Sequence, residues 1–496
     1  MSSIMNALQM LTVEAMLYTA FGTFAGIIVG AIPGLTATMA VAVLTSFTFG
    51  MESMDAIAMM LGVFVGGVYG GSIAAILMKV PGTSSAVMTS LDGYPMAQRG
   101  EAGRAIGIST VSSFIGGMFS CIVLILGCSL IATIAEKFGY PEYFVLSIFG
   151  LIVIADASSE SLLKGLLAAA LGIFITTIGM DSLTGLNRFT FGSSQLMAGI
   201  DQVPVLIGLF GIAEIIRQVF NADKQTQQKQ KIGRIFPGWK TIWKLKKTLL
   251  RASIIGTGVG AMPGAGGPIA AFVAYNSEKS ASDHPEKFGT GIDEGIAAPE
   301  CSNNATVGGA LIPMLALGVP GDGVTAIIMS TFAIHGLRLG PMIFTEQADI
   351  VSGVYLYAMI ANVVMVFMGI FMARFFAKML NLDKMLLLPL ILMVCMIGAY
   401  ASSNKVFFIF VMIVFGVLGF LLERVGVSSS ALVLGMVLGD LLETNLRQAL
   451  ILSKGDYGIF FERPICIFFW VLTLLMVGIP QIKKRLAARK KNAAES

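Results

Sequence analysis

Long hydrophobic stretches recur along almost the whole chain, and short polar segments separate them. Many of these stretches are about 20 residues long, which is the length that a helix needs to cross a bilayer. The pattern therefore predicts an all-α polytopic membrane protein, built as a helical bundle rather than a barrel. The predicted spans cover residues 12–31, 55–80, 104–135, 142–156, 161–180, 203–220, 305–318, 323–337, 350–379, 385–400, 405–423, 430–442 and 464–481.

Composition supports this interpretation. Of the 496 residues, 56% are hydrophobic and only 12% are charged, whereas soluble domains carry about 25% charged residues. The chain is therefore too apolar to cover a soluble surface. No cleavable signal segment is evident, so the first span is expected to be retained as a transmembrane helix. Disulfide or metal roles are not expected, because the cysteines occur singly, at Cys121, Cys128, Cys301, Cys395 and Cys466.

Four Gly/Pro breaks interrupt the hydrophobic stretches. The first lies in GAIPG at 30–34, and the second lies at Pro81. The third lies in GAMPG at 260–264, and the fourth lies at Pro320. Since lipid offers no partner to backbone N–H and C=O groups, a broken helix survives in a bilayer only where protein or a wet cavity surrounds it. We therefore expect broken or re-entrant helices at these four places, with ordinary loops as the alternative.

The breaks belong to an internal repeat. Pro263 follows Pro33 by 230 residues, within the matching sequences GAIPG and GAMPG. Pro320 follows Pro81 by 239 residues, within GGSIAAILMKVPGTSS and GGALIPMLALGVPGDG. ASSE at 157–160 matches ASSN at 401–404, an offset of 244 residues. Three matches in the same order, with slowly drifting offsets, indicate one duplicated unit.

Domain boundaries are predicted from this repeat and from charge. The first membrane repeat covers residues 1–220, and the second covers 252–460. Residues 221–251 form a polar linker with nine Lys or Arg residues, and residues 461–496 form an extra transmembrane helix and a basic tail. Because Lys- and Arg-rich segments stay in the cytoplasm, the linker and the tail are both placed inside. An odd number of spans per repeat then inverts the second repeat relative to the first, an arrangement typical of secondary transporters.

The breaks also supply candidate binding groups. A helix N-terminus exposed at a break attracts anions, whereas freed carbonyl groups and helix C-termini suit Na⁺. The predicted substrate-binding residues are the small polar and glycine residues near the breaks, namely Gly34, Thr36, Thr38, Thr83, Ser84, Ser85, Gly264, Gly266, Asn303, Asn304, Thr306 and Gly321. Asp322 and Asn304 are the candidate ligands of a Na⁺ ion. For each polar residue the alternative is a cap on a helix end.

Charged residues and motifs do not favour an enzyme. Asp322 is a candidate to bind a cation, to carry a proton, or simply to cap the following helix. Glu300 and Lys79 flank the breaks and are expected at membrane interfaces. The sequence contains no HExxH, no GxxxxGK[ST] and no Gly-x-Gly-Asp, so a metalloprotease, an ATP-driven pump and an intramembrane aspartyl protease are all disfavoured. No cofactor is expected apart from a coupling ion.

Four long segments make the chain similar to a known family. They read GAIPGLTATMAVAVL, GGVYGGSIAAILMKVPGTSSAVMTSLDGYPMAQRGEAGRA, GAMPGAGGPIAAFVAYNSEK and PEKFGTGIDEGIAAPECSNNATVGGALIPMLALGVPGDGVTAI. With these segments the sequence resembles the large membrane subunit of the tripartite tricarboxylate transporters, the TctA-type family, over nearly its whole length.

This resemblance implies a multi-pass protein of the bacterial inner membrane. The implied partners are a small membrane subunit (TctB-type), a periplasmic solute-binding protein (TctC-type) and an organic-acid substrate, with no nucleic acid. The implied function is the import of tricarboxylates or related organic acids, with Na⁺ as the expected coupling ion and citrate as one candidate substrate. The alternatives are a stand-alone ion–carboxylate symporter without a binding protein and, with less support, a membrane enzyme.

Overall fold

Helices form nearly all of the structure. The computed structural model describes residues 10–32, 34–80, 82–135, 137–158, 161–181, 184–220, 232–379 and 384–475. Within these residues the only strands are β1 (Gly179–Met180) and β2 (Asn187–Arg188), which pair antiparallel. The prediction of an all-α polytopic protein is thus confirmed. The first part of the predicted linker, 221–231, and the basic tail, 476–496, lie outside the described residues.

The helices form two compact units, each assembled from two separate stretches of the chain. The first unit comprises Met1–Ala135 and Asp201–Leu421, and the second comprises Glu136–Ile200 and Leu422–Ser496. Each unit therefore takes segments from both predicted repeats. The repeat boundaries stay a prediction, because compactness divides the chain in a different way from the repeat.

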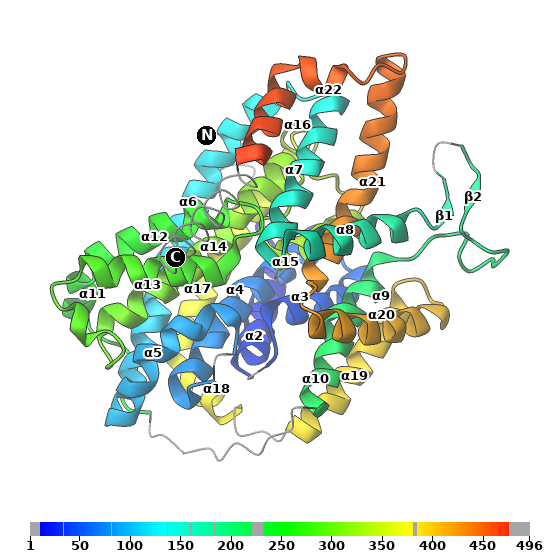
Figure 1. The fold of residues 1–496 in the computed structure, drawn as a ribbon. Helices are drawn as coiled ribbons and strands as arrows, with labels where there is room; N and C mark the ends of the chain where they lie inside the picture. Colours follow the sequence, from blue (N-terminus) through cyan, green and yellow to red (C-terminus); the bar gives the residue numbers. More distant parts are fainter. Residues whose placement is uncertain are drawn as a thin grey trace, which may run out of the picture. The chain divides into compact units, whose positions relative to one another are not determined.

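Figure 1 labels the elements, most of which belong to the first unit. This unit contains α2 (Val13–Ala31), α3 (Ala37–Thr45), η1 (Ser46–Gly50), α4 (Ser53–Met78), η2 (Ser84–Ala86), α5 (Val87–Met96), η3 (Ala97–Glu101), α6 (Ala102–Ala135), α9 (Gln202–Leu206), η4 (Ile207–Ile212), α10 (Ala213–Phe220), α11 (Trp239–Lys244), α12 (Lys246–Gly260), α13 (Gly266–Ala281), η5 (Pro285–Lys287), α14 (Asp293–Leu317), α15 (Gly323–Ile334), α16 (Ile343–Glu346), α17 (Ala348–Phe371), α18 (Ala373–Met379), α19 (Lys384–Ala401) and α20 (Phe407–Arg424). The second unit contains α7 (Tyr140–Ser158), α8 (Leu162–Thr176), β1, β2, α21 (Ser429–Leu452), α22 (Ile459–Glu462) and a last helix, Pro464–Leu475.

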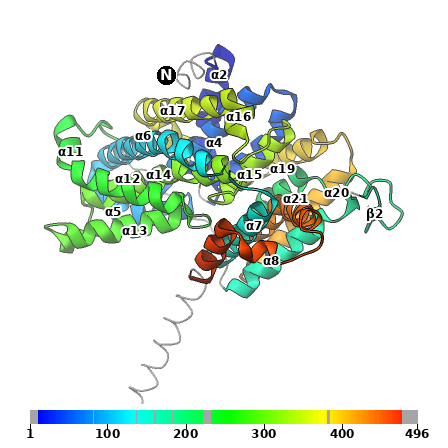
Figure 2. The ribbon, with the colours of Figure 1, turned by 90° about the horizontal axis from the view of Figure 1, so that it is seen from above.

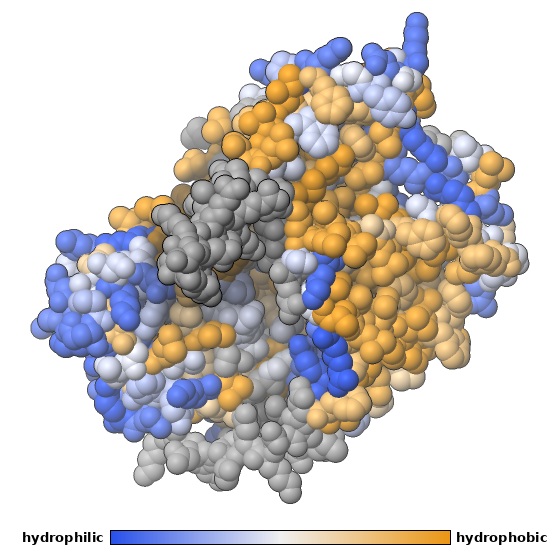
Figure 3. Space-filling view, viewed as in Figure 1, coloured by the Kyte–Doolittle hydropathy of each residue, from blue (hydrophilic) through white to orange (hydrophobic). Residues whose placement is uncertain are grey.

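Several of these helices have the length and composition of membrane spans. Six such spans occur within the described part of the chain, at Val13–Ala31, Ser53–Met78, Ser84–Cys128, Gln202–Phe220, Ala348–Phe371 and Phe407–Arg424. On α20 the side chains of Phe410, Val414 and Leu421 are each more than half exposed. Figure 3 shows hydrophobic side chains gathered over the region of α19 and α20. An apolar surface of this kind is suited to contact with lipid.

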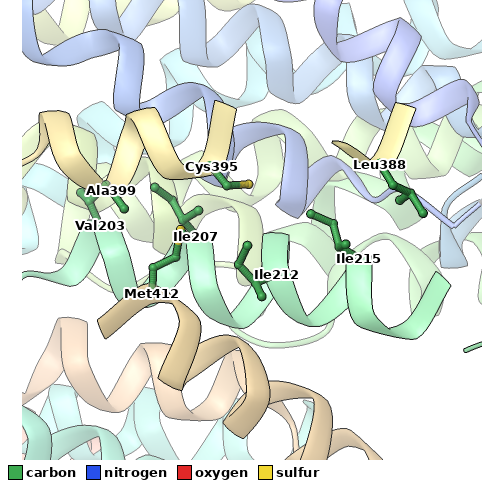
Figure 4. Close-up of a cluster of buried hydrophobic side chains, with 8 residues drawn as sticks. All are labelled: Val203, Ile207, Ile212, Ile215, Leu388, Cys395, Ala399 and Met412. Atoms are coloured by element: carbon green, nitrogen blue, oxygen red, sulfur yellow. The ribbon is translucent and has the colours of Figure 1, made fainter. Parts of the chain in front are cut away.

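A hydrophobic cluster joins three helical segments of the first unit. Figure 4 shows the cluster, in which the continuous helix α9–η4–α10 faces α19 and α20. Its members are Val203, Ile207, Ile212, Ile215, Leu388, Cys395, Ala399 and Met412. These side chains are at most 9% exposed, so they form a packed core that fixes the three segments against one another.

The second unit is built around α21, which packs along α7 and α8. Its buried core contains Leu151, Ala169, Leu434 and Leu438. Arg447 on α21 forms an ion pair with Asp181 at 2.9 Å, and Arg188 of β2 forms one with Glu443 of α21 at 2.7 Å, and these pairs tie the β hairpin segment to the helix.

Close backbone contact brings α2 and α4 of the first unit together. Gly30 on α2 lies against the carbonyl oxygen of Gly67 on α4. A Cβ atom placed on Gly70 would lie only 2.5 Å from the carbonyl oxygen of Ile27. Glycine is therefore required at this interface, since any side chain would push the two backbones apart.

The second half of the chain repeats these contacts between α12 and α14. A Cβ atom on Gly260 would lie 2.7 Å from Thr306 Cα, and one on Gly309 would lie 2.6 Å from the carbonyl oxygen of Thr257. Relative to the first pair, the residues on α12 follow those on α2 by 230 positions, and the residues on α14 follow those on α4 by 239 positions. These are the two offsets seen between the Gly/Pro breaks.

Backbone conformation repeats with the same offsets. Lys79 (φ 56°) and Gly318 (φ 68°) end α4 and α14 in the left-handed conformation. Gly34 (φ 92°) and Gly264 (φ 83°) adopt it after α2 and α12. The duplication is thus present in the contacts and in the backbone of the fold, whereas the inverted orientation of the second copy stays a prediction.

We predict that Gly256→Val destabilises the protein, because a Cβ atom at this position meets the backbone of Ser302 on α14. Overpacking of this kind costs about 1–3 kcal/mol, so the apparent melting temperature in detergent should fall by several degrees. Gly258→Val on the same helix is the matched control, because a Cβ atom there meets nothing within 4 Å. Equal melting temperatures for the two variants would contradict the close packing of α12 on α14.

The inverted orientation is testable by labelling two exposed residues, Glu52 before α4 and Glu286 before α14. These helices are counterparts in the repeat, so inversion places their preceding loops on opposite faces of the membrane. Single substitutions Glu52→Cys and Glu286→Cys should react with a membrane-impermeant maleimide from opposite sides of oriented vesicles. Labelling of both from one side would refute the inversion.

Candidate functional site

All four predicted breaks interrupt a helix. The interruptions cover residues 32–36, 79–83, 261–265 and 318–322, and they are called here the first, second, third and fourth breaks. Pro33 and Pro81 themselves lie outside the described residues, but the chain on both sides of each is described. All four breaks belong to the first compact unit.

The two breaks of each half lie beside one another. The Gly264 N–H donates to the Gly321 carbonyl at 2.7 Å and so joins the third break to the fourth. In the first half, Gly82 of the second break lies against the carbonyl oxygen of Gly30, in the turn of α2 that leads into the first break. The Gly82 N–H itself donates to the Gly71 carbonyl of α4 at 3.3 Å. These two hydrogen bonds, from Gly264 and from Gly82, provide partners for backbone groups that the breaks release from helical hydrogen bonding.

Breaks from different halves also meet. The helix α13, which follows the third break, packs against η2, which follows the second break. A Cβ atom on Gly267 in the first turn of α13 would lie 3.2 Å from Ser85 Oγ and 2.5 Å from Asn303 Oδ1. The side chains of Ser85 and Asn303 therefore converge on the N-terminus of α13. Figures 1 and 2 show α12, α13 and α14 side by side around this place.

Asn303 is the most informative side chain of this cluster. It is only 1% exposed, and neither its amide nitrogen nor its amide oxygen has a hydrogen-bond partner among the described residues. A buried amide without partners costs free energy. Its position beside the free N–H groups and the positive dipole end of α13 is suited to an anionic ligand with its own hydrogen-bonding groups.

A cavity of about 440 Å³ lies between α5 and α13. Its lining includes Lys79, Lys279, Asn276 and Tyr275. Both lysines are exposed, so the cavity presents two positive charges beside the helices that carry Ser85 and Gly267. The volume lies within the range of about 300–1,000 Å³ that is usual for small-ligand sites.

The remaining residues near the second break differ in exposure. Thr83 is 7% exposed, and its hydroxyl oxygen lies 3.4 Å from Ser85 Oγ. Ser84 is exposed. Of these three predicted site residues, Ser85 is the one that faces Gly267.

The first break has a different character from the second and third. Thr36 Oγ1 accepts a hydrogen bond from Met39 N–H at 3.1 Å and caps α3. Thr38 is partly buried in the first turn of α3, and Gly34 lies next to the Gln218 side chain. The neighbouring Leu35 belongs to an apolar cluster, so this break offers fewer polar groups to a charged substrate.

Asp322 of the fourth break caps a helix. Its carboxylate accepts a hydrogen bond from the Thr325 N–H at 2.8 Å, and the Asp322 N–H donates to Thr325 Oγ1 at 2.9 Å, so that the two bonds form a capping box on α15. Of the roles that the sequence offered for Asp322, the structure shows the cap on the following helix. Gly266 approaches it, since a Cβ atom on Gly266 would lie 3.7 Å from Asp322 Cβ.

The polar residues of α14 lie in the middle of the helix rather than beside a break. Thr306 donates to the carbonyl of Asn303 at 2.6 Å. Asn304 donates to Ser113 Oγ at 2.7 Å and to the carbonyl of Glu300 at 3.2 Å. The candidate Na⁺ ligands Asn304 and Asp322 thus have separate surroundings, Asn304 next to α6 and Asp322 at the start of α15.

The expectation that Glu300 and Lys79 lie at membrane interfaces stays a prediction, and the two residues differ in burial, since Lys79 is exposed. Glu300 is 0% exposed, because it lies in the first half of α14 with α5 and α6 packed against that helix. Thr89, Ser109 and Ser113 donate hydrogen bonds to its carboxylate. The sequence contained a signal for this burial, since the surrounding Gly, Ala and Ser residues allow close packing of helices.

The sequence did not single out Asp92, which organises the loop before α14. Asp92 is 0% exposed, and its Oδ1 accepts hydrogen bonds from the N–H groups of Gly289, Gly291 and Ile292 at 2.8–3.1 Å. Its Oδ2 accepts a hydrogen bond from Tyr275 OH at 2.8 Å. This carboxylate thereby holds α5, α13 and the loop together around the cavity.

These features define a class of protein. A polytopic helical membrane protein with duplicated broken helices, whose breaks meet at a buried polar place, has features that are typical of membrane transporters. Comparison with known proteins agrees with this class. Residues 16–434 match the Tripartite tricarboxylate transporter TctA family, and the chain therefore belongs to that family.

Two relatives from Agrobacterium vitis are similar to this chain. One is described as an uncharacterized 52.8 kDa protein in the TAR-I ttuC' 3'region, and it is 37% identical over 461 residues, which are 92% of this chain and 90% of the relative. The other is described as an uncharacterized protein in the TAR-II ttuC' 3'region, and it is 38% identical over 233 residues, which are 46% of this chain and 96% of the relative. No solved structure matches the chain.

We predict that Asp92→Asn loosens the loop before α14, because the variant replaces hydrogen bonds to a charged group by weaker neutral ones. Such bonds are worth about 1.5–3 kcal/mol each, so trypsin should cleave at the exposed Lys287 markedly faster than in the wild type. Asp283→Asn, at an exposed position in the same connection, should leave the cleavage rate unchanged. Equal rates for Asp92→Asn and the wild type would show that Asp92 does not hold the loop.

Proposed function

We propose that the chain is the large transmembrane subunit of a binding-protein-dependent secondary transporter of the bacterial inner membrane. It imports tricarboxylates or related organic acids, and the uptake is coupled to Na⁺. Its partners are a small membrane subunit and a periplasmic solute-binding protein. Family membership supports the transport class, and the word tripartite in the family description supports the two partners.

The observation that most favours an organic anion as the substrate is the unpartnered amide of Asn303, which lies beside Ser85 and the N-terminus of α13. A helix N-terminus with free N–H groups binds carboxylates without a full positive charge. The Asn303 amide and the Ser85 hydroxyl group add a donor each, and both also act as acceptors toward a substrate hydroxyl group. Weak multipoint binding of this kind suits a carrier, because the substrate must also leave.

The two lysines at the cavity also favour a negatively charged substrate. Lys79 and Lys279 line the space between α5 and α13, and positive charges in a cleft raise the local concentration of anions. We propose that carboxylates enter through this cavity before they reach Ser85 and Asn303.

We further propose that transport moves the broken elements against a scaffold of the remaining spans, by a rocking or elevator-like motion. The duplicated contacts of α2 with α4 and of α12 with α14 support this proposal, because each pair packs backbone to backbone as one rigid element. The cluster that joins α9–η4–α10 to α19 and α20 supplies a separate packed element.

We predict that Asn303→Ala and Ser85→Ala each reduce organic-acid uptake by about tenfold or more, since loss of one hydrogen bond to a charged group removes about 1.5–3 kcal/mol of binding. Ser280→Ala is the matched control, because Ser280 is exposed on α13 at the opposite end of the helix from Gly267. Uptake of radiolabelled carboxylates by cells with equal amounts of each variant gives the measurement. Wild-type uptake in both Asn303→Ala and Ser85→Ala would remove this cluster from the substrate site.

Reconstitution tests the tripartite arrangement. Proteoliposomes with the two membrane subunits should take up the organic acid only when the solute-binding protein is added on the outside and a Na⁺ gradient is imposed. Uptake by this chain alone would instead identify a stand-alone symporter.

A further inference from the structure

One buried carboxylate near the proposed substrate site has no cationic partner. Glu300 is 0% exposed, and its recorded partners are the hydroxyl groups of Thr89, Ser109 and Ser113. Within the described residues no Lys, Arg or His forms an ion pair with it. An ionised carboxylate inside a membrane protein is costly unless a positive charge accompanies it, so its presence points to a functional role.

The two oxygens of Glu300 have different surroundings. Oε1 accepts a close hydrogen bond from Thr89 Oγ1. Oε2 lies 3.4 Å from Ser109 Oγ and 3.3 Å from Ser113 Oγ, which is longer than the usual O–H···O distance of about 2.7–2.8 Å. Oxygen ligands that lie about 2.4 Å from a hard cation, at right angles to one another, are about 3.4 Å apart. The spacing around Oε2 therefore fits the ligand shell of a cation.

Asn304 supplies an independent indication of a missing ligand. This side chain is 0% exposed, and its Nδ2 donates to Ser113 Oγ at 2.7 Å. Its Oδ1 has no hydrogen-bond partner among the described residues. Ser113 Oγ links this amide to Glu300 Oε2, so the same cluster contains an acceptor oxygen that is buried and unpartnered and a carboxylate oxygen with only long contacts.

We propose that Glu300 Oε2, Ser109 Oγ, Ser113 Oγ and Asn304 Oδ1 bind one Na⁺ ion. The ligands are all oxygens, as a hard cation requires. They contain one carboxylate, which balances a single positive charge. A divalent ion fits less well, because the described residues contain no group of three or more His, Cys, Asp or Glu side chains that could hold a metal.

The proposed cation site is close to the proposed anion site along α14 and also along the segment formed by η2 and α5. Glu300 precedes Asn303 by three residues on α14, and Thr89 follows Ser85 by four residues along η2 and α5. At about 1.5 Å per residue, each separation is about one helical turn. An unoccupied Glu300 carboxylate repels a carboxylate substrate at Ser85 and Asn303, and Na⁺ removes this repulsion. By linkage the substrate then raises the affinity for Na⁺, which is the basis of coupled transport.

The transport role of this site rests on the proposed function, but Na⁺ binding is measurable without transport. The purified full-length chain in detergent is titrated with NaCl at constant ionic strength, with choline chloride as the replacement salt, and its thermal stability is recorded. The wild type should be stabilised saturably by Na⁺. Loss of one ligand in Ser113→Ala should raise the half-saturating Na⁺ concentration about tenfold, which corresponds to about 1.4 kcal/mol.

Ser112→Ala is the matched control, because Ser112 is a buried neighbour of Ser113 on the same helix and should keep the wild-type titration. Glu300→Gln should abolish the Na⁺ response, and Ser113→Ala keeps the test decisive if Glu300→Gln does not fold. No Na⁺ response in the wild type, or identical titrations for Ser113→Ala and the wild type, would overturn the site. Na⁺ binding with the predicted pattern, together with an absence of organic-acid uptake, would contradict the proposed function and leave the cation site in place.

Discussion

The fold depends on the need of every backbone N–H and C=O group for a partner where lipid supplies none. Four helices of the first compact unit end at Gly/Pro breaks, and the released backbone groups must be satisfied within the protein. The hydrogen bond from Gly264 to Gly321 joins two breaks, and the hydrogen bond from Gly82 to Gly71 joins a break to a neighbouring helix, so both show how the breaks satisfy this need. Glycine at the crossings of α2 with α4 and of α12 with α14 permits the close approach that such pairing requires.

The same constraint creates the polar chemistry of the site. Where a break stops a helix inside the protein, the next helix begins with free N–H groups that attract negative charge. The first turn of α13 lies in this position, and Ser85 and Asn303 from two other elements converge on it. Glu300 lies about one turn before Asn303 on α14, at the proposed cation site. The packing of broken helices therefore places the proposed anion site and the proposed cation site about one helical turn apart.

The sequence predicted the all-α fold and the positions of the four breaks, because hydrophobic length and Gly/Pro punctuation are local signals. The repeat offsets of 230 and 239 were also visible, and they match the paired contacts of Gly30 with Gly67 and of Gly260 with Thr306. Which polar residues share a site was harder to predict, since it depends on how the helices cross. Asp322 and Thr36 cap helices, whereas Asn303 is buried without partners, although the sequence offers similar small polar residues at all three places.

The burial of Glu300 and the role of Asp92 were not predicted from the sequence, and both omissions have the same origin. Glu300 was expected at an interface because carboxylates inside a bilayer are rare, and only the crossing of α14 with α6 shows how Ser109 and Ser113 surround it. Asp92 is one of many acidic residues in the sequence, and nothing local indicates that three backbone N–H groups almost 200 residues away would bind it. The family relationship confirms the class of protein, and the particular chemistry rests on these tertiary contacts.

The central claim is that the second and third breaks, from different halves of the chain, meet at the organic-anion site. A disulfide between Ser85→Cys and Gly267→Cys measures it most directly, because Ser85 Cβ lies 3.2 Å from a Cβ atom placed on Gly267, and a shift of a few tenths of an ångström brings the two atoms into the range of about 3.5–4.5 Å that disulfides need. The account predicts rapid cross-linking of the double variant under mild oxidation and no cross-link in either single variant. A double variant that does not cross-link would contradict it.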